Sequence, residues 1–135
     1  MADNKIRLEI VTPKRLFFSG EVENVSVPGA EGYLGILPGH APLLSELKTG
    51  VITYSEGTRT TRLYSGWGFV EVLPDQVSVL CEEAALPQDI DVEKARKDKS
   101  RAQELLASKD PETDYRQALQ MLKHAEARLE AAQHS

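Results

Sequence analysis

The spacing of apolar residues along this chain changes near Pro87. Before this proline, apolar residues recur at every second position in short runs separated by turn residues. After it the chain has no glycine, and apolar residues recur at every third or fourth position. Strand patterns followed by helix patterns predict a two-domain α+β chain, with a mainly β sandwich or flattened barrel over residues 1–87 and an antiparallel two-helix domain over residues 88–135.

The predicted strands follow from the alternation. Lys5–Val11 alternates apolar and polar side chains, as a half-buried strand does. Leu16–Phe18 is expected to form a second strand that ends at Ser19-Gly20, and Glu21–Val27 a third, whose phase shift halfway along is compatible with a β-bulge. Two hairpins are predicted further on: Gly50–Ser55 with Thr58–Tyr64 around Glu56-Gly57, and Gly66–Leu73 with Gln76–Glu82 around Pro74-Asp75.

A glycine-rich segment, Gly29–Leu47, lies between these groups of strands. Four glycines and a proline fall within its first eleven residues, a density typical of linkers. Linkers have few apolar residues, whereas Leu34, Ile36 and Leu37 lie between these turn-formers. We therefore expect a sharply bent segment that is tied into the core. The glycine spacing matches neither a dinucleotide fingerprint nor a P-loop, since no Gly-Lys-Ser/Thr follows.

Two helices are predicted beyond Pro87. Asp110 is expected to cap the second helix, with Pro111 at its first position. Alanine is frequent on the apolar faces, and burying alanine removes little apolar area from water. We therefore expect the helices to bind each other and the sandwich weakly, and to have more than one position. The apolar positions are Val92, Ala95, Ala102 and Leu106 in the first helix, and Tyr115, Ala118, Leu122, Ala125, Leu129 and Ala132 in the second.

Charge and cysteine content exclude several classes of function. A net charge of -5 argues against nucleic acid as a partner. The single cysteine, Cys81, rules out an intramolecular disulfide and a cysteine-based zinc cluster, and it suits a reducing compartment. No secretory signal pattern begins the chain, and no apolar run approaches the roughly 18 to 20 residues of a membrane span. Contact with a membrane is therefore expected only through other subunits.

No set of nucleophile, base and orienting residue emerges from the sequence, so no catalytic or metal-binding residue is predicted. His40 lies in a bend without a neighbouring cysteine or second histidine, which favours a structural role. The first helix carries a cluster of bases that suits either phosphate or an acidic protein surface, or else a solvated face with local ion pairs such as Glu93 with Lys97. These bases are Lys94, Arg96, Lys97, Lys99 and Arg101.

Two motifs give the chain a family resemblance. The run Gly35-Ile36-Leu37-Pro38-Gly39-His40-Ala41-Pro42-Leu43-Leu44 and the later Ser65-Gly66-Trp67-Gly68-Phe69-Val70-Glu71-Val72 resemble those of the epsilon subunit of bacterial-type rotary ATP synthase. The resemblance covers the whole chain. It implies a non-catalytic rotor subunit of the central stalk that binds the gamma subunit and the c-ring and helps couple ion flow to ATP synthesis. It also implies a peripheral location, on the cytoplasmic side of a plasma membrane or the stromal side of a thylakoid.

The resemblance further implies roles for particular residues. Contact with the c-ring is expected from Glu31, Gly32, Tyr33 and His40. In many members of the family the helices move between a compact state on the sandwich and an extended state that enters the catalytic head, next to the alpha and beta subunits, and blocks ATP hydrolysis. The resemblance implies that the bases of the first helix would then meet acidic segments of the beta subunits.

Some members of the family bind ATP between the folded helices, as a regulatory ligand. Here Lys94 and His124 stand where that site has arginine. Because neither side chain reproduces the planar guanidinium fork, we expect ATP binding to be weak or absent. A rotor and regulatory subunit and a nucleotide-sensing module thus remain as alternative functions. The matching positions are Ile90, Asp91, Lys94, Ala95, Arg101, His124 and Arg128.

Overall fold

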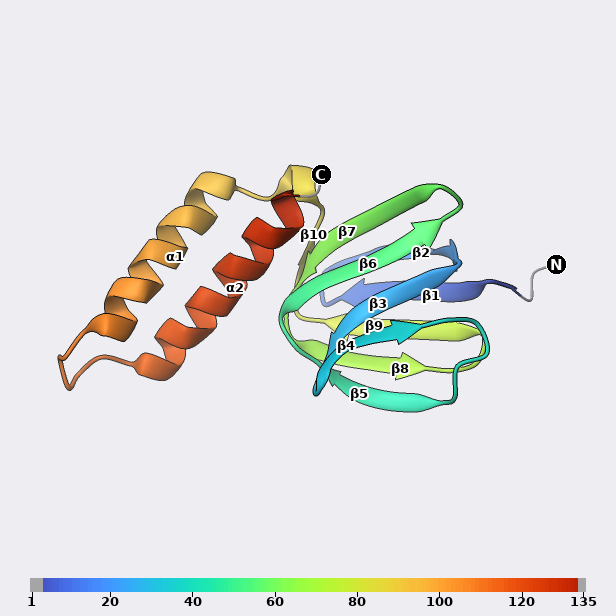
Figure 1. Ribbon diagram of the computed structural model, residues 1–135, viewed down its shortest axis with the longest axis horizontal. Helices are drawn as coiled ribbons and strands as arrows, with labels where there is room; N and C mark the ends of the chain where they lie inside the picture. The colour runs from blue at the N-terminus through green and yellow to red at the C-terminus, as the bar shows by residue number, and fades with distance from the viewer. Residues whose placement is uncertain (1–3, 134–135) are drawn as a thin grey trace.

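The computed structural model describes residues 4–133 as a strand-rich part with a helical hairpin packed against one side (Figure 1). This arrangement confirms the predicted sandwich and two-helix hairpin. The strands are β1 Ile6–Thr12, β2 Arg15–Val22, β3 Asn24–Gly29, β4 Gly32–Ile36, β5 Leu43–Leu47, β6 Gly50–Glu56, β7 Arg59–Ser65, β8 Gly68–Val72, β9 Gln76–Cys81 and β10 Ala84–Ala85. A 3₁₀ turn, η2 Pro87–Asp89, leads to helices α1 Val92–Ala107 and α2 Tyr115–Gln133.

The strands form one strongly curved sheet. Its order is β10-β7-β6-β3-β5-β8-β9-β1-β2, and β4 pairs with β3 off this path. Neighbouring strands are antiparallel except β1 and β9, which are parallel. The sheet folds over so that the inward side chains of its two halves meet in one core, as in a flattened barrel.

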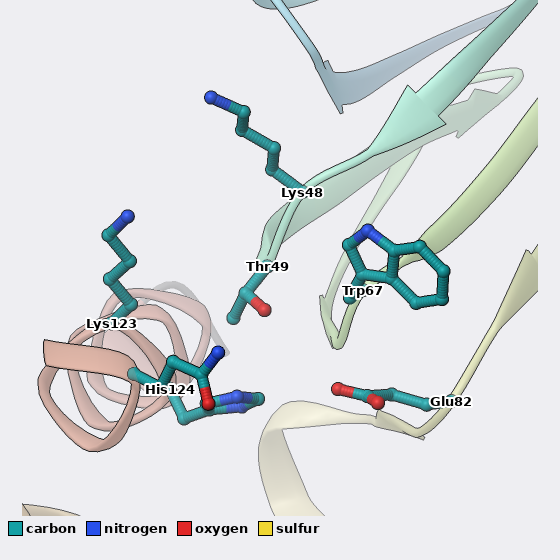
Figure 2. A pocket seen from close by; sticks show the side chains of 7 residues that line it. Lys48, Thr49, Trp67, Glu82, Lys123 and His124 are labelled. Atoms are coloured by element: carbon teal, nitrogen blue, oxygen red, sulfur yellow. The ribbon is translucent and has the colours of Figure 1, made fainter. Parts of the chain in front are cut away.

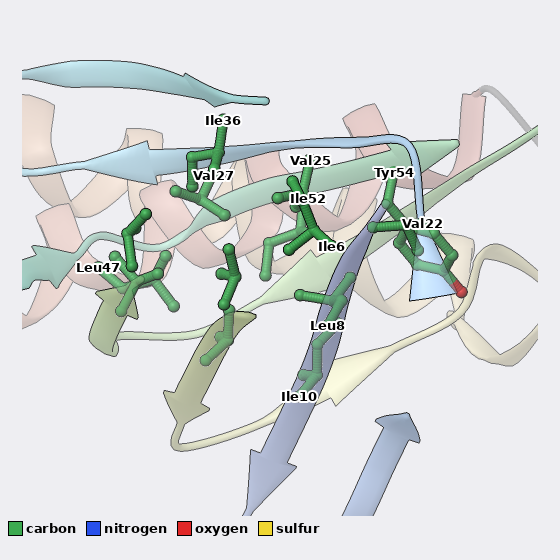
Figure 3. Close-up of a cluster of buried hydrophobic side chains, with 14 of the residues drawn as sticks. Ile6, Leu8, Ile10, Val22, Val25, Val27, Ile36, Leu47, Ile52 and Tyr54 are labelled. Carbon is green, nitrogen blue, oxygen red and sulfur yellow. The ribbon is translucent and has the colours of Figure 1, made fainter. Parts of the chain in front are cut away.

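The core consists of the residues that alternate inward. In β1, Ile6, Leu8 and Ile10 are completely buried while Arg7 is exposed. The same alternation buries Val77, Val79 and Cys81 in β9, as predicted. Figure 3 shows the side chains of Ile6, Leu8 and Ile10 among the other core residues, between the two halves of the sheet.

The boundary between β2 and β3 differs from the prediction. Strand β2 continues through Gly20 to Val22, and the chain bends at Glu23 before β3 begins. Glu21–Val27 is therefore not a single strand. The shift in its apolar alternation between Val22 and Val25 arises because β2 ends and β3 begins there. The bulge in this region lies instead in the β1–β2 ladder, between Ile10 and Val11. Gly20 does not end β2 because it pairs with Leu8, and its missing side chain leaves room for the ring of Phe18.

The glycine-rich segment forms a hairpin and an ordered loop. Gly32, with φ of +127°, closes the turn between β3 and β4, a backbone conformation that favours glycine. Gly39, with φ of +85°, lies in the loop that follows β4, where its N–H donates to the carbonyl of Pro74 at 2.8 Å. Ile36 is buried in the core. The segment is thus tied into the sandwich, as expected.

The helices begin at aspartates. Asp91 caps α1 by accepting from the N–H of Lys94 at 3.0 Å. The predicted start of α2 is wrong: Asp114 accepts from the N–H of Gln117 at 3.0 Å, and α2 starts at Tyr115. Asp110 lies in the connection, where its carboxylate accepts from the N–H of Glu112 at 2.9 Å. The later aspartate caps the helix because only its carboxylate reaches the third helical N–H.

Every buried residue of the two helices within residues 92–133 is an alanine. Ala95 and Ala102 are buried in α1, and Ala118 and Ala125 in the facing seam of α2. The expected alanine-rich seam is therefore present. Two further alanines of α2 are buried outside that seam, and they lie against the sandwich instead.

Candidate functional site

The junction between the hairpin and the sandwich is a small apolar contact. Ala127 and Ala131 of α2 pack with Val51 of β6 and Tyr64 of β7. The partly buried side chains of Ala85 and Ile90 complete the cluster. Six residues, three of them alanines, hold far less apolar area than the sixteen buried residues of the sandwich core. The hairpin is therefore attached much more weakly than the sandwich is held together.

Polar contacts surround this apolar cluster. The hydroxyl of Tyr64 lies 2.6 Å from Nδ1 of His124. Arg128 forms an ion pair with Glu83, which lies between β9 and β10, and its guanidinium lies 4.5 Å from the centre of the Tyr64 ring. We call Tyr64, Glu83, His124 and Arg128 the docking cluster. Its members come from three separate parts of the chain, so it forms only when the hairpin is docked.

Tyr64 is the centre of the docking cluster. Burial, and then the hydrogen bond of its hydroxyl with the Glu83 carboxylate, raise the pKa of Tyr64 far above its ordinary value, although the charge of Arg128 acts in the opposite direction. The phenol therefore keeps its proton at any physiological pH. As a permanent hydroxyl it connects the sandwich to α2.

The predicted nucleotide-site residues are only partly brought together. Five of them line one cavity of about 190 Å³ between the hairpin and the β10 region: Ile90, Asp91, Lys94, Ala95 and Arg128. Arg101 lies outside this cavity and forms an ion pair with Glu104 at 3.8 Å. His124 lies outside it as well, in the docking cluster.

The charges around this cavity do not suit a triphosphate. Two cations, Lys94 and Arg128, stand among three carboxylates of Asp89, Asp91 and Asp98, which leaves a net charge of -1. Both cations are already paired, Lys94 with Asp98 at 3.0 Å and Arg128 with Glu83. The predicted residues therefore do not fit ATP as they stand.

The predicted c-ring residues lie at two ends of the sandwich. Glu31, Gly32 and Tyr33 form the β3–β4 turn, where the Tyr33 hydroxyl accepts from the N–H of Val51 at 3.1 Å. His40 follows the other end of β4, beside the β8–β9 turn. The length of a five-residue strand, roughly 16 Å, separates the two positions.

The basic residues of α1 are mostly engaged locally. Lys94 pairs with Asp98, and Arg96 pairs with Glu93 at 3.0 Å. Glu93 thus contacts Arg96 rather than the expected Lys97. Lys97 and Lys99 form no ion pair with any described residue.

The sequence did not predict an exposed row of apolar side chains on the sandwich. The strand registers pair Phe69 with Leu80, Leu80 with Val11, and Val11 with Leu16, which makes a row across β8, β9, β1 and β2. Leu16 is 56% exposed, Leu80 54% and Phe69 45%. The exposed Trp67 packs edge-on against Phe69, with ring centroids 5.1 Å apart. This apolar row forms only after four strands take their register, so no local pattern could show it.

Two kinds of feature are absent from residues 4–133. They contain no group of three or more histidine, cysteine, aspartate or glutamate side chains that could hold a metal ion. None of the helices in this range is long and apolar enough to span a bilayer.

Comparisons with known proteins agree with the fold. A family model described as "ATP synthase, Delta/Epsilon chain, beta-sandwich domain" matches residues 5–87, and one described as "ATP synthase, Delta/Epsilon chain, long alpha-helix domain" matches residues 88–133. The ATP synthase epsilon chain of Koribacter versatilis is 48% identical over 112 residues, 83% of this chain and 78% of the relative. That of Moorella thermoacetica is 42% identical over 128 residues, 94% of this chain and 96% of the relative.

Solved structures give the same result. A chain in the OSCP/F1/c-ring assembly of Euglena gracilis mitochondrial ATP synthase matches with a TM-score of 0.85 and 26% identity, over 97% of this chain and 82% of that one. A chain in the central stalk and c-ring assembly of Tetrahymena thermophila mitochondrial ATP synthase has a TM-score of 0.66 at 12% identity, over 95% of this chain and 96% of that one. The second match supports the fold alone.

Proposed function

The chain belongs to the ATP synthase delta/epsilon chain family, and from this premise we propose that it is a non-catalytic rotor subunit of the central stalk. Its work is done through protein contacts that help couple ion translocation to ATP synthesis. It lies at the periphery of the membrane, on the side of the F1 head, and reaches the bilayer only through the assembled complex. The observation that carries this proposal is the exposed apolar row on the sandwich.

The apolar row suits the gamma subunit as partner. An apolar surface made by neighbouring strands and exposed in the isolated chain is typical of a protein–protein interface. The aromatic pair Trp67 and Phe69 supplies the kind of side chain that contributes most to binding energy. The row does not include the β3–β4 turn, so both surfaces can be occupied at once.

Replacing Leu80 by aspartate tests the gamma contact. Leu80 is 54% exposed, so the change should leave folding intact while placing a charge at the centre of the interface. We expect the variant to lose association with the gamma subunit in reconstitution and to keep the wild-type thermal transition. Thr58→Asp, on the exposed β6–β7 turn, is the matched control and should assemble normally. Normal assembly of the Leu80→Asp variant would contradict the proposed interface.

The β3–β4 turn is the proposed contact with the c-ring. Tyr33 is 58% exposed, and its ring is held in place by the hydrogen bond to Val51. A held aromatic side chain beside the exposed Glu31 makes a preformed contact surface. Tyr33→Asp should lower ion-driven ATP synthesis by the assembled complex. Full synthesis by this variant would argue against direct contact.

The helical hairpin is the proposed inhibitory element. Its small apolar junction and separable docking cluster permit release from the sandwich, which would carry the bases of α1 to the alpha and beta subunits. Deleting Pro87–Ser135 should raise the ATPase activity of the assembled complex and leave assembly intact. Unchanged ATPase activity in this truncation would count against an inhibitory hairpin.

Nucleotide sensing is the weaker alternative. The net charge of -1 around the predicted site and the pairing of both its cations disfavour a triphosphate. Calorimetric titration of the full chain with ATP and magnesium should therefore show no micromolar binding. Micromolar binding that is lost in Asp91→Ala would restore the sensing function.

A further inference from the structure

A polar cleft lies between the sandwich and the first half of α2, next to the apolar contact that Ala127 and Ala131 make. Its volume is about 670 Å³. The sandwich contributes the β5–β6 turn, the β7–β8 turn and the residue after β9, and α2 contributes Gln120, Lys123 and His124. Figure 2 shows these walls facing one another across the opening. The lining residues are Lys48, Thr49, Trp67, Glu82, Gln120, Lys123 and His124.

One side of the cleft carries uncompensated positive charge. Lys48 comes from the β5–β6 turn and Lys123 from α2, and both side chains extend toward the same side of the opening (Figure 2). Neither ammonium group forms an ion pair with another residue in the range 4–133. Thr49, which follows Lys48 in the β5–β6 turn, adds a hydroxyl to the lining of the cleft. Two free ammonium groups from separate domains favour an anion that bridges them.

The opposite side of the cleft has different chemistry. Glu82 presents a carboxylate that forms no ion pair with any described residue. Beside it lies the indole of Trp67, whose N–H donates to Glu46 at 2.6 Å and so fixes the ring. The Glu82 carboxylate can accept hydrogen bonds from hydroxyl groups of a ligand, and it repels a second anionic group. The indole of Trp67 can pack against the carbon atoms of that ligand.

From this arrangement we propose that the cleft binds a small organic phosphate. Its phosphate group lies between Lys48 and Lys123, and its hydroxyl-bearing remainder faces Trp67 and Glu82. Because the walls come from both domains, the site is complete only when the hairpin is docked. Binding and docking are therefore linked, and a ligand at ten times its dissociation constant should raise the docked-to-undocked ratio about elevenfold. The proposal does not depend on the stalk function.

Titration of the full chain with ribose 5-phosphate tests the site. Trp67 is the only tryptophan in the sequence, so its fluorescence reports on the cleft. We expect saturable binding at constant ionic strength, weaker binding of inorganic phosphate, and no binding of ribose. Lys48→Gln and Lys123→Gln should each weaken binding about tenfold, the effect of losing one charged hydrogen bond. Glu82→Gln should remove the preference for ribose 5-phosphate over inorganic phosphate.

A matched control separates this site from general electrostatics. Lys109 is an exposed lysine in the connection between α1 and α2, at the end of the hairpin remote from the sandwich (Figure 1). Lys109→Gln removes the same charge and should leave binding unchanged, with circular dichroism confirming that every variant is folded. The proposal is overturned if sodium chloride reproduces the signal, if Lys109→Gln weakens binding as much as Lys48→Gln, or if inorganic phosphate binds as tightly as ribose 5-phosphate.

Discussion

Replacing Arg128 by alanine should release the helical hairpin from the sandwich. The change removes the ion pair with Glu83 and the contact with the ring of Tyr64. The Arg128 side chain is 29% exposed and that of Glu83 46%, so solvent screens the ion pair to about 0.5–1 kcal/mol. The cation–π contact adds about 0.5–1 kcal/mol. Together they amount to about 1–2 kcal/mol, or roughly a 5- to 30-fold fall in the docked-to-undocked ratio.

Distances between fluorescent labels on the two domains would measure this ratio. Labels at Thr58→Cys and Lys109→Cys report on the sandwich and on the far end of the hairpin, and the buried Cys81 competes little for labelling. Arg128→Lys is the matched control, because it keeps the charge and loses the planar stacking group. We expect it to restore part of the docked population.

A double-mutant cycle identifies the cause of the shift. Glu83→Gln removes the same ion pair from the other side, so its effect and that of Arg128→Ala should couple by about 0.5–1 kcal/mol. A change in the docked-to-undocked ratio of less than twofold in Arg128→Ala would refute the role given to the docking cluster. Strict additivity of the two substitutions would refute the ion pair as its source.

Three further predictions concern the rest of the chain. Burial raises the pKa of the Cys81 thiol, so little of it is thiolate near neutral pH. Iodoacetamide should therefore react far more slowly with Cys81 in the native chain than in the urea-unfolded chain. The reaction rate of the native chain should rise with pH. Gly68→Ala should destabilise the sandwich by about 3 kcal/mol, measured by urea unfolding, because the added Cβ would come within 1.8 Å of the Leu80 carbonyl oxygen; an unchanged midpoint would contradict this. Asp91→Ala should cost about 1 kcal/mol through loss of the α1 cap, seen as reduced helicity on heating, and wild-type helicity would show that the cap is dispensable.

The predicted c-ring and nucleotide residues show that local motifs predict contacts between neighbours in sequence but not between distant parts of the chain. Glu31, Gly32 and Tyr33 are neighbours in sequence and form one turn, so their grouping was predictable. His40 follows the other end of the same strand, and its distance from that turn depends on β4 being extended. His124 pairs with Tyr64, which lies 60 positions away in the chain, and no spacing rule predicts such a partner.

Short sequence patterns were enough to predict both helices, most of the strands, and the buried faces of β1 and β9. Alternation at every second position fixed the inward faces of β1 and β9, and the loss of glycine beyond Pro87 fixed the helices, because these patterns act over a few neighbouring residues. Local cues misplaced the boundaries at Gly20 and Asp110. They also failed to predict the strands β4 and β5 inside the glycine-rich segment, where turn residues interrupt the alternation.

The way in which these elements pack together could be seen only in the folded structure. The parallel pairing of β1 with β9 and the apolar row through Leu80 depend on register across distant strands. Which face of α2 meets the sandwich was decided by Ala127 and Ala131, which lie outside the seam that the helical spacing predicts. Contacts of this kind depend on the relative position and orientation of whole elements, and no short stretch of sequence encodes either quantity.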